Sequence, residues 1–266
     1  MPLLEHLVEL RSRLLYSVIT LIVAFFVCFY FAAPLFNFLV APLADIWQGD
    51  PERRLIFTAL HEKFLTDVKV AFFAALFVSF PLISAQLWTF VAPGLYKREK
   101  MAFLPFLIAT PILFFGGGAF VYYVVLPVAW QFFAGFEQFG GEGLLAIELE
   151  PKVDQYLSLV MRLIFAFGLS FELPVVISLL ARVGFTTSEG LKRKRRYAVL
   201  LAFVAAAILT PPDPLSQIGL AIPIILLYEI SIWCARLIEK KREAEDETLG
   251  DDGDESGESD EQPSAV

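Results

Sequence analysis

Cysteine and histidine are scarce in this sequence, which has two of each among 266 residues. Cys28 and Cys234 lie in two apolar stretches that we predict to cross a membrane, near its opposite faces. We therefore expect neither a disulfide nor a cysteine-ligated metal. His6 and His61 fall on opposite sides of the predicted membrane, which excludes a shared metal site. The sequence also lacks a Walker-type phosphate loop and the paired histidines of a zinc protease. We therefore expect no metal, no cofactor and no ATP-driven work by this chain alone.

Apolar residues are abundant: they make up 57% of the chain, which includes 27 Phe, and the mean hydropathy is +0.65. Most of the apolar stretches reach the ~20 residues that cross a ~30 Å hydrocarbon core. The sequence therefore predicts an all-α polytopic membrane protein. The six stretches are Leu14–Ala33, Val68–Ala92, Ala102–Leu126, Tyr156–Ala181, Tyr197–Leu209 and Leu215–Ala235.

The segments between these stretches alternate between rich and poor in Lys and Arg. By the positive-inside rule this pattern predicts that both termini are cytosolic. We expect no cleavable signal peptide, because Met1 leads straight into a charged amphipathic segment. A Ser- and Arg-rich transit peptide is not seen either, which favours the inner membrane of a bacterium. The basic segments carry Arg11 and Arg13, Lys97 to Lys100, Arg182, Lys192 to Arg196, Arg236 and Lys240 to Arg242.

The last two apolar stretches are unusual. Tyr197–Leu209 measures only about 20 Å as a helix and ends at three prolines within Thr210–Pro214, which block a continuing helix. Leu215–Ala235 follows and contains Pro223 and Glu229. We predict two short spans in a locally thinned membrane, with a re-entrant hairpin as the alternative.

The net charge of −8 comes from the end of the chain. Residues 239–266 are dominated by Asp and Glu and have almost no apolar side chains, so burial cannot offset the entropy of ordering them. We therefore divide the chain into a transmembrane domain of residues 1–238 and an acidic, disordered cytosolic tail of residues 239–266. The tail is interpreted as a solvating segment, with a docking role as the alternative.

A carboxylate lies near the middle of the fourth stretch, at Glu172. Such a group is costly in a membrane and usually faces a partner group or a wet cavity. Three roles are open: a hydrogen-bonded structural group, a proton relay, or a contact for the helix of another protein. Pro174 frees a backbone carbonyl nearby. Arg162 lies about 15 Å away along the helix, too far for a salt bridge, and is expected to snorkel outward.

Two further carboxylates, Glu9 and Glu99, lie among basic residues at the predicted cytosolic edge. Taken singly, each fits an ordinary interfacial ion pair of small energetic value. Taken together, they are able to form an acidic site for a cationic ligand at the membrane surface, where a guanidinium would be held bidentately.

Four motifs accompany the predicted spans: His6-Leu-x-Glu-Leu-Arg-x-Arg-Leu14, Phe90-x-Ala-Pro-x-Leu-Tyr-Lys-x-Glu99, Phe171-Glu-x-Pro174 and Thr210-Pro-Pro-Asp-x-x-Ser-Gln217. In these motifs and in their order the chain resembles the TatC family, the largest membrane subunit of the twin-arginine protein translocase. The resemblance covers about residues 3–238. It implies a concave bundle of six transmembrane helices with short fifth and sixth spans.

The resemblance implies a receptor, not an enzyme, that binds the twin-arginine signal peptides of folded cargo at the cytosolic face. It also implies a multimeric complex with the single-span proteins TatA and TatB, surrounding membrane lipid, no nucleic acid, and export driven by the proton-motive force. Glu172 would be exposed in the concave face and contact a partner helix. The implied residues are Glu9, Arg11, Phe90, Leu95, Tyr96 and Glu99 for the signal peptide, Glu172 and Gln217 for a partner helix, and Pro42 and Asp213 as periplasmic functional positions.

Two other classes of function are alternatives. A proton-coupled transporter would use Glu172 as its relay, but no inverted repeat relates the first and last three spans. A membrane-embedded enzyme would use Asp213 and Glu172 as acid and base, but these residues are expected at different depths.

Overall fold

The computed structural model describes residues 3–47, 53–91, 100–138, 145, 147–210 and 214–254. Within these ranges the chain is helical, and its only β pairing consists of two isolated bridges. This confirms the all-α prediction. The helices are α1 (Leu3–Tyr30), α2 (Ala32–Ile46), α3 (Glu62–Val91), α4 (Lys100–Phe120), the π-helical turn η3 (Val121–Val125), α5 (Leu126–Ala134), α6 (Val153–Phe171), α7 (Leu173–Arg182), α8 (Ser188–Leu209) and α9 (Pro214–Asp254).

Five helical segments are long and apolar enough to cross a membrane. One of them combines α4, η3 and α5, and another combines α6 and α7. The shorter apolar helix is α2, with 15 residues. Helix α8 begins with a charged half and ends with the apolar stretch Tyr197–Leu209. The spanning segments are Leu7–Tyr30, Glu62–Phe90, Pro105–Ala134, Val153–Arg182 and Gln217–Lys241.

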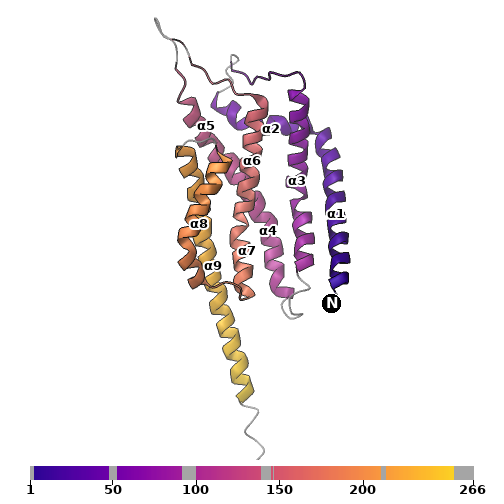
Figure 1. Cartoon of the computed structure of the whole chain (residues 1–266), viewed down its shortest axis with the longest axis vertical. Helices are drawn as coiled ribbons and strands as arrows, with labels where there is room; N and C mark the ends of the chain where they lie inside the picture. The colour runs from indigo at the N-terminus through magenta and orange to yellow at the C-terminus, as the bar shows by residue number, and fades with distance from the viewer. Residues whose placement is uncertain are drawn as a thin grey trace, which may run out of the picture.

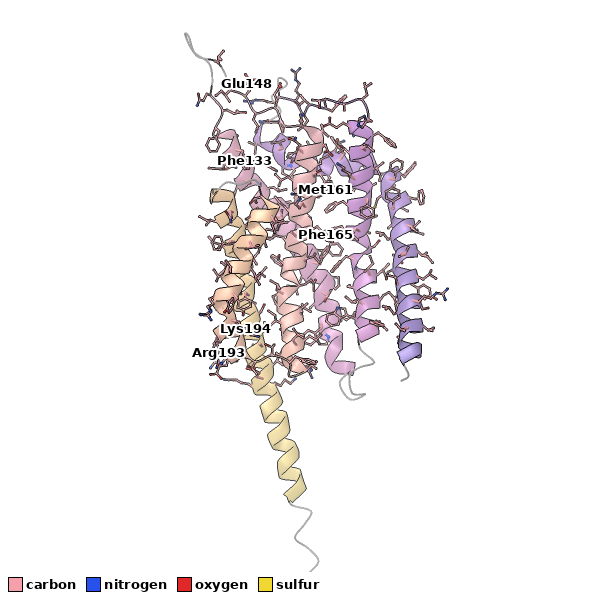
Figure 2. The ribbon with its side chains drawn as sticks, in the orientation of Figure 1. Phe133, Glu148, Met161, Phe165, Arg193 and Lys194 are labelled. Carbon is pink, nitrogen blue, oxygen red and sulfur yellow. The ribbon has the colours of Figure 1, made fainter. Side chains whose placement is uncertain are left out.

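The helices stand side by side with their long axes roughly aligned (Figure 1). Neighbours in space follow the order α1, α3, α4, α6 with α7, α9 and α8. We call the end that holds the start of α1 the lower end, and the end that holds α2 the upper end. Arg193 and Lys194 lie at the lower end and Glu148 at the upper end (Figure 2).

The largest core surrounds α6. Residues such as Leu157, Val160 and Phe167 of this helix are completely buried and pack against α2, α3, η3, α5, α8 and α9. In contrast, α1 packs mainly on α3, where Cys28 contacts three alanines of α3. Beyond Arg13, the side chains of α1 are almost all apolar, and those that α3 does not cover suit a lipid environment.

Glycines allow α4 and α6 to approach closely. A Cβ atom built on Gly117 would lie 2.7 Å from the carbonyl oxygen of Phe167, and one built on Gly168 would lie 2.8 Å from the Phe114 ring. Small residues that let two helix backbones come together are typical of membrane interfaces. Gly117 and Gly168 therefore serve helix packing, whereas a Cβ atom on Gly116 would meet nothing within 4 Å.

An ion pair between Arg53 and Glu137 connects two loop segments at the upper end. Arg53 donates two hydrogen bonds to the carboxylate of Glu137, at 2.5 and 2.8 Å, and the N–H of Leu149 donates a third at 3.1 Å. These hydrogen bonds hold the pKa of Glu137 below its ordinary value, and the bond from Arg53 has the largest effect. An isolated bridge between Ile56 and Lys152 joins the segment of Arg53 to that of Leu149.

Helices α8 and α9 form an antiparallel pair that meets at a lower level than the start of α6 (Figure 1). The short apolar half of α8 fits the short fifth span expected from the sequence, whereas the last spanning segment has 25 residues and is not short. Pro223 lies inside α9 without ending it. Sequence analysis expects a disordered tail from residue 239, whereas α9 continues to Asp254, through residues such as Glu, Lys, Arg and Ala that favour helix. The domain division at residue 238 stays a prediction.

Candidate functional site

The lower ends of α1 and α3 are joined through Arg13. Its guanidinium donates to Oε1 of Gln86 on α3 at 3.0 Å and lies 3.4 Å from Oε1 of Glu9, one helical turn away on α1. The side chain of Glu9 is 28% exposed and that of Arg13 is 32% exposed. Glu9 is therefore an anchored carboxylate that a ligand is still able to reach.

Other residues of the predicted signal-peptide site lie nearby or outside the described residues. Phe90 is half-buried near the end of α3, one turn beyond Gln86, and Arg11 is exposed on α1. Helices α1 and α3 run in opposite directions (Figure 1). Because Arg13 bonds to Gln86, both Glu9 and Phe90 lie toward the lower end, each one turn from this contact along its own helix. Leu95, Tyr96 and Glu99 lie outside the described residues, and their roles stay predictions.

Arg13 and Gln86 are not among the site residues predicted from the sequence. The signal for Arg13 was present, because a carboxylate and an arginine four residues apart face each other on a helix. Gln86 had no such signal, since its contact with α1 depends on how the two helices pack.

Glu172 occupies the junction between α6 and α7. Its carbonyl accepts from the N–H of Val176 at 2.9 Å, while Pro174 has no N–H to donate to Ser170 and so separates the two helices. Glu172 is only 9% exposed. The expectation that it is exposed in the concave face is therefore wrong: the bundle covers its side chain.

Polar side chains of two neighbouring helices surround this carboxyl group. Thr110 of α4 is within hydrogen-bonding reach of Glu172, and Trp88 of α3 donates its indole N–H to the Thr110 hydroxyl at 3.2 Å. Oε1 of Glu172 is buried and has no hydrogen-bond partner among the described residues. The side chains of Trp88, Thr110 and Glu172 thus connect three helices and leave one acceptor available.

Pro42 is buried inside α2. Because proline has no N–H, the carbonyl of Phe38, four residues earlier, lacks its usual donor in the helix. The hydroxyl of Tyr122 in η3 donates to this carbonyl at 2.7 Å, and the Tyr122 ring stacks on that of Phe38 with 4.5 Å between centroids. Pro42 therefore leaves open the acceptor that joins α2 to η3.

Gln217 lies in the first turn of α9 and donates from Nε2 to the carbonyl of Phe203 on α8 at 3.2 Å. Its described contact is with α8, and not with Glu172. Asp213 lies outside the described residues, so its role stays a prediction. Among the described residues, no group of three or more His, Cys, Asp or Glu is placed to hold a metal ion.

Comparison with known proteins identifies the family of this chain. Residues 5–223 match the family model described as Sec-independent protein translocase protein (TatC). The chain belongs to the TatC family.

Relatives of known name support this family assignment along most of the chain. The TatC protein of Magnetococcus marinus is 53% identical over 241 residues, which cover 91% of this chain and 86% of that protein. The TatC protein of Escherichia coli K12 is 42% identical and covers 88% of both chains. A crystal structure of the twin-arginine translocase receptor TatC matches with a TM-score of 0.76 at 39% identity, and covers 88% of this chain and 99% of that one.

Membership of the TatC family settles several predictions. The chain is a multi-pass membrane subunit of a bacterial Sec-independent protein translocase and has the six-helix polytopic fold. It is a transport component and not an enzyme, which removes the membrane-embedded enzyme from consideration. As a Tat translocase subunit, it works in a complex with other subunits.

Proposed function

We propose that this chain is the receptor subunit that binds twin-arginine signal peptides at the cytosolic face of the membrane. In this proposal it also recruits single-span partners of the TatA and TatB type, and export is driven by the proton-motive force. The observation that carries the proposal is the carboxylate of Glu9, which is accessible, faces a guanidinium and lies at the basic end of the bundle. The crystal structure of a relative described as the receptor supports it.

The orientation follows from the basic residues at the lower end. Arg193 and Lys194 mark this end (Figure 2), and the exposed Arg11 lies there as well. Since Lys and Arg are retained on the cytosolic side, we place the lower end, both termini and Glu9 in the cytosol. The upper end, with α2, then faces the periplasm.

Arg13 shows how Glu9 would receive a signal peptide. At 3.4 Å its guanidinium makes only a long contact with Glu9, while its bond to Gln86 is 3.0 Å. An incoming arginine that binds bidentately forms shorter, stronger bonds. It would therefore replace Arg13 at Glu9, and Arg13 would keep its bond to Gln86. Glu99 would receive the second arginine.

The apolar segment that follows the arginines in a signal peptide needs an apolar path. Leu14, Val18 and Ile22 of α1 are all exposed and lie one turn apart along the helix. In this proposal the peptide runs upward along this face from Glu9.

Glu172 would serve the partner subunits. Leu169 and Val176 flank it at helical spacing and are 46% and 45% exposed. A partner helix that docks on these two side chains would come next to the buried Oε1, which has no described partner. For a polar side chain on that helix to donate a hydrogen bond to Oε1, the side chains that cover Glu172 would have to move aside.

Photocrosslinking from Phe90 in native membranes tests the signal-peptide site. We expect a crosslink to a twin-arginine precursor and none to its twin-lysine variant. Glu9→Gln should reduce the crosslink on the order of tenfold, because a charge-assisted bond contributes about 1.5–3 kcal/mol. Glu189→Gln, an exposed acidic residue on α8 at the same end, is the matched control and should leave it unchanged. Equal reduction by both variants would remove Glu9 from the site.

Two variants of Glu172 test the partner contact. Glu172→Gln keeps an acceptor oxygen, so copurification of the single-span partners should be largely retained. Glu172→Ala removes the acceptor and should abolish it. Equal loss in both variants would contradict the hydrogen-bond role and favour titration of the carboxyl group.

A further inference from the structure

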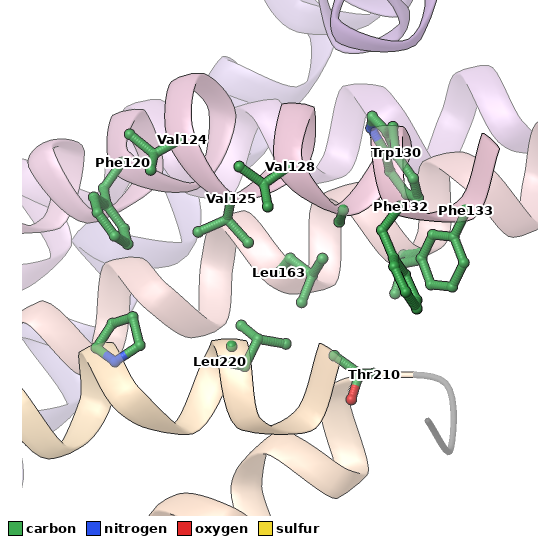
Figure 3. Close-up of a pocket in the computed structure, with 14 residues that line it drawn as sticks. Phe120, Val124, Val125, Val128, Trp130, Phe132, Phe133, Leu163, Thr210 and Leu220 are labelled. Carbon is green, nitrogen blue, oxygen red and sulfur yellow. The ribbon is translucent and has the colours of Figure 1, made fainter. Parts of the chain in front are cut away.

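Two adjoining cavities lie near the upper end of the bundle. A cavity of about 210 Å³ lies between η3, α5, α6 and α9 and is lined almost entirely by apolar side chains such as Val128 and Leu163 (Figure 3). A second cavity, of about 870 Å³, borders α6, the segment 149–152 and the end of α8. Four residues line both cavities, which therefore adjoin each other: Trp130, Phe133, Leu159 and Thr210.

A polar stripe on α6 faces the larger cavity. Gln155, Ser158 and Arg162 all line it, and their spacing of three and four residues puts them on one face of the helix. These side chains offer hydrogen-bond donors at successive turns. The stripe leads from the upper end of α6 toward the apolar cavity.

Arg162 carries a positive charge that no described residue balances. It is exposed to the cavity and has no ion pair or hydrogen bond with the residues that the structure describes. The two carboxylates in the same wall are already paired, because Asp154 bonds to Lys69 at 2.5 Å and Glu150 to Arg54 at 3.4 Å. The wall of the cavity is therefore left with a net positive charge.

The depth of Arg162 makes this charge informative. It lies nine residues into α6, about 14 Å along the axis, within the spanning segment Val153–Arg182. A charge at such a depth is costly unless it faces an ion of opposite sign or water. A cationic polar cavity beside an apolar one suits a ligand with an anionic head and a hydrocarbon chain.

We propose that the two cavities together bind one anionic glycerophospholipid. Its phosphate would contact Arg162, with Ser158 and Gln155 as further donors, and an acyl chain would enter the apolar cavity between α5 and α9. Lipid fits better than a soluble anion, because the apolar cavity adjoins the cation at membrane depth. The proposal does not depend on signal-peptide binding, which is placed at the opposite end of the bundle.

Quenching of Trp130 tests this proposal, because the ring lines both cavities and is buried. The chain has four tryptophans, and replacing Trp47, Trp88 and Trp233 by Phe leaves Trp130 as the single reporter. The protein would be placed in phosphatidylcholine nanodiscs that contain a small fraction of brominated phosphatidylglycerol or of brominated phosphatidylcholine. We expect brominated phosphatidylglycerol to reach half-maximal quenching at a lipid fraction on the order of tenfold lower than brominated phosphatidylcholine, because one charge-assisted contact contributes about that much affinity.

Variants at Arg162 separate the headgroup contact from lipid in general. Arg162→Gln should abolish the preference for the anionic lipid, and Arg162→Lys should keep most of it. Arg193→Gln, an exposed arginine at the opposite end, is the control and should not change it. Native mass spectrometry of the chain with all four tryptophans, with and without Arg162→Gln, gives a second readout: the variant should lose one bound anionic lipid.

Several outcomes would overturn the proposal. Equal quenching by both lipids would mean that the cavity takes acyl chains without recognising the head. No quenching by either brominated lipid would mean that water or a partner helix occupies the cavity. Displacement of the brominated lipid by an excess of soluble glycerophosphoglycerol would assign it to a free anion.

Discussion

The close approach of α4 and α6 at Gly117 supports the sharpest prediction. In Gly117→Ala the new Cβ would lie 2.7 Å from the Phe167 carbonyl oxygen and 3.0 Å from the Gly168 Cα. Both are backbone atoms, so no flexible side chain is able to move aside. The helices would have to separate by roughly 0.7 Å to restore an ordinary contact of 3.4 Å. Tightly packed interfaces resist such shifts.

Gly116→Ala is the matched control, because a Cβ there meets nothing within 4 Å. Both substitutions gain the same helix propensity, about 1 kcal/mol, so this gain cancels in the comparison. The overpacking that remains in Gly117→Ala costs about 1–3 kcal/mol. We expect Gly117→Ala to be less stable than Gly116→Ala by about this amount.

Unfolding of the purified protein in mixed micelles with rising SDS, followed by far-UV circular dichroism, measures this difference. The packing of α4 against α6 also brings Thr110 close to Glu172. Thr110 lies two turns before Gly117 on α4, and Glu172 lies one turn after Gly168. Gly117→Ala should therefore also weaken copurification of the partner subunits, and Gly116→Ala should not. Equal unfolding midpoints for the two variants would refute the close approach of the two backbones.

Two contacts at the upper end give further predictions. Tyr122→Phe leaves the Phe38 carbonyl without a donor and should lower the free energy of unfolding by about 1–3 kcal/mol. In a Pro42→Ala background the restored N–H bonds to this carbonyl, so Tyr122→Phe should be nearly neutral. Additive losses in the double variant would contradict this account. The lowered pKa of Glu137 means that its bond to Arg53 stabilises the fold above the ordinary pKa of 4.5 and that this stabilisation is lost as the pH falls through the lowered pKa. An acid-stable protease should therefore cleave the segment 135–152 faster as the pH falls. Glu137→Gln should already be cleaved at neutral pH. A wild-type cleavage rate that does not change with pH would contradict the prediction.

Some features of the site follow from local patterns in the chain. Apolar stretches of sufficient length identify the spanning helices, because a bilayer leaves few other ways to satisfy the backbone. The i,i+4 spacing of Glu9 and Arg13 predicts their contact without any knowledge of the neighbouring helices. The glycine run 116–118 indicates helix packing, although sequence alone does not show which of the three glycines meets the other helix.

Other features depend on contacts between distant segments. Glu172 was expected to be exposed, but Thr110 and Trp88 come from two other helices to cover it. Single-helix periodicity does not reveal this cover. The continuation of α9 beyond residue 239 has a different cause: composition points to a charged, solvated segment, and such a segment is also able to extend an existing helix.

The sequence by itself determined the membrane as the solvent, the number and rough lengths of the spans and the family. These follow from apolar length, basic residues and short motifs, which are local properties of the chain. Only the tertiary structure decided that Arg13 already faces Glu9 and Gln86, that Pro42 leaves a carbonyl for Tyr122, and that Arg162 opens onto a cavity. Each of these is a relation between helices far apart in sequence, and it is set by how their side chains pack and not by any one helix.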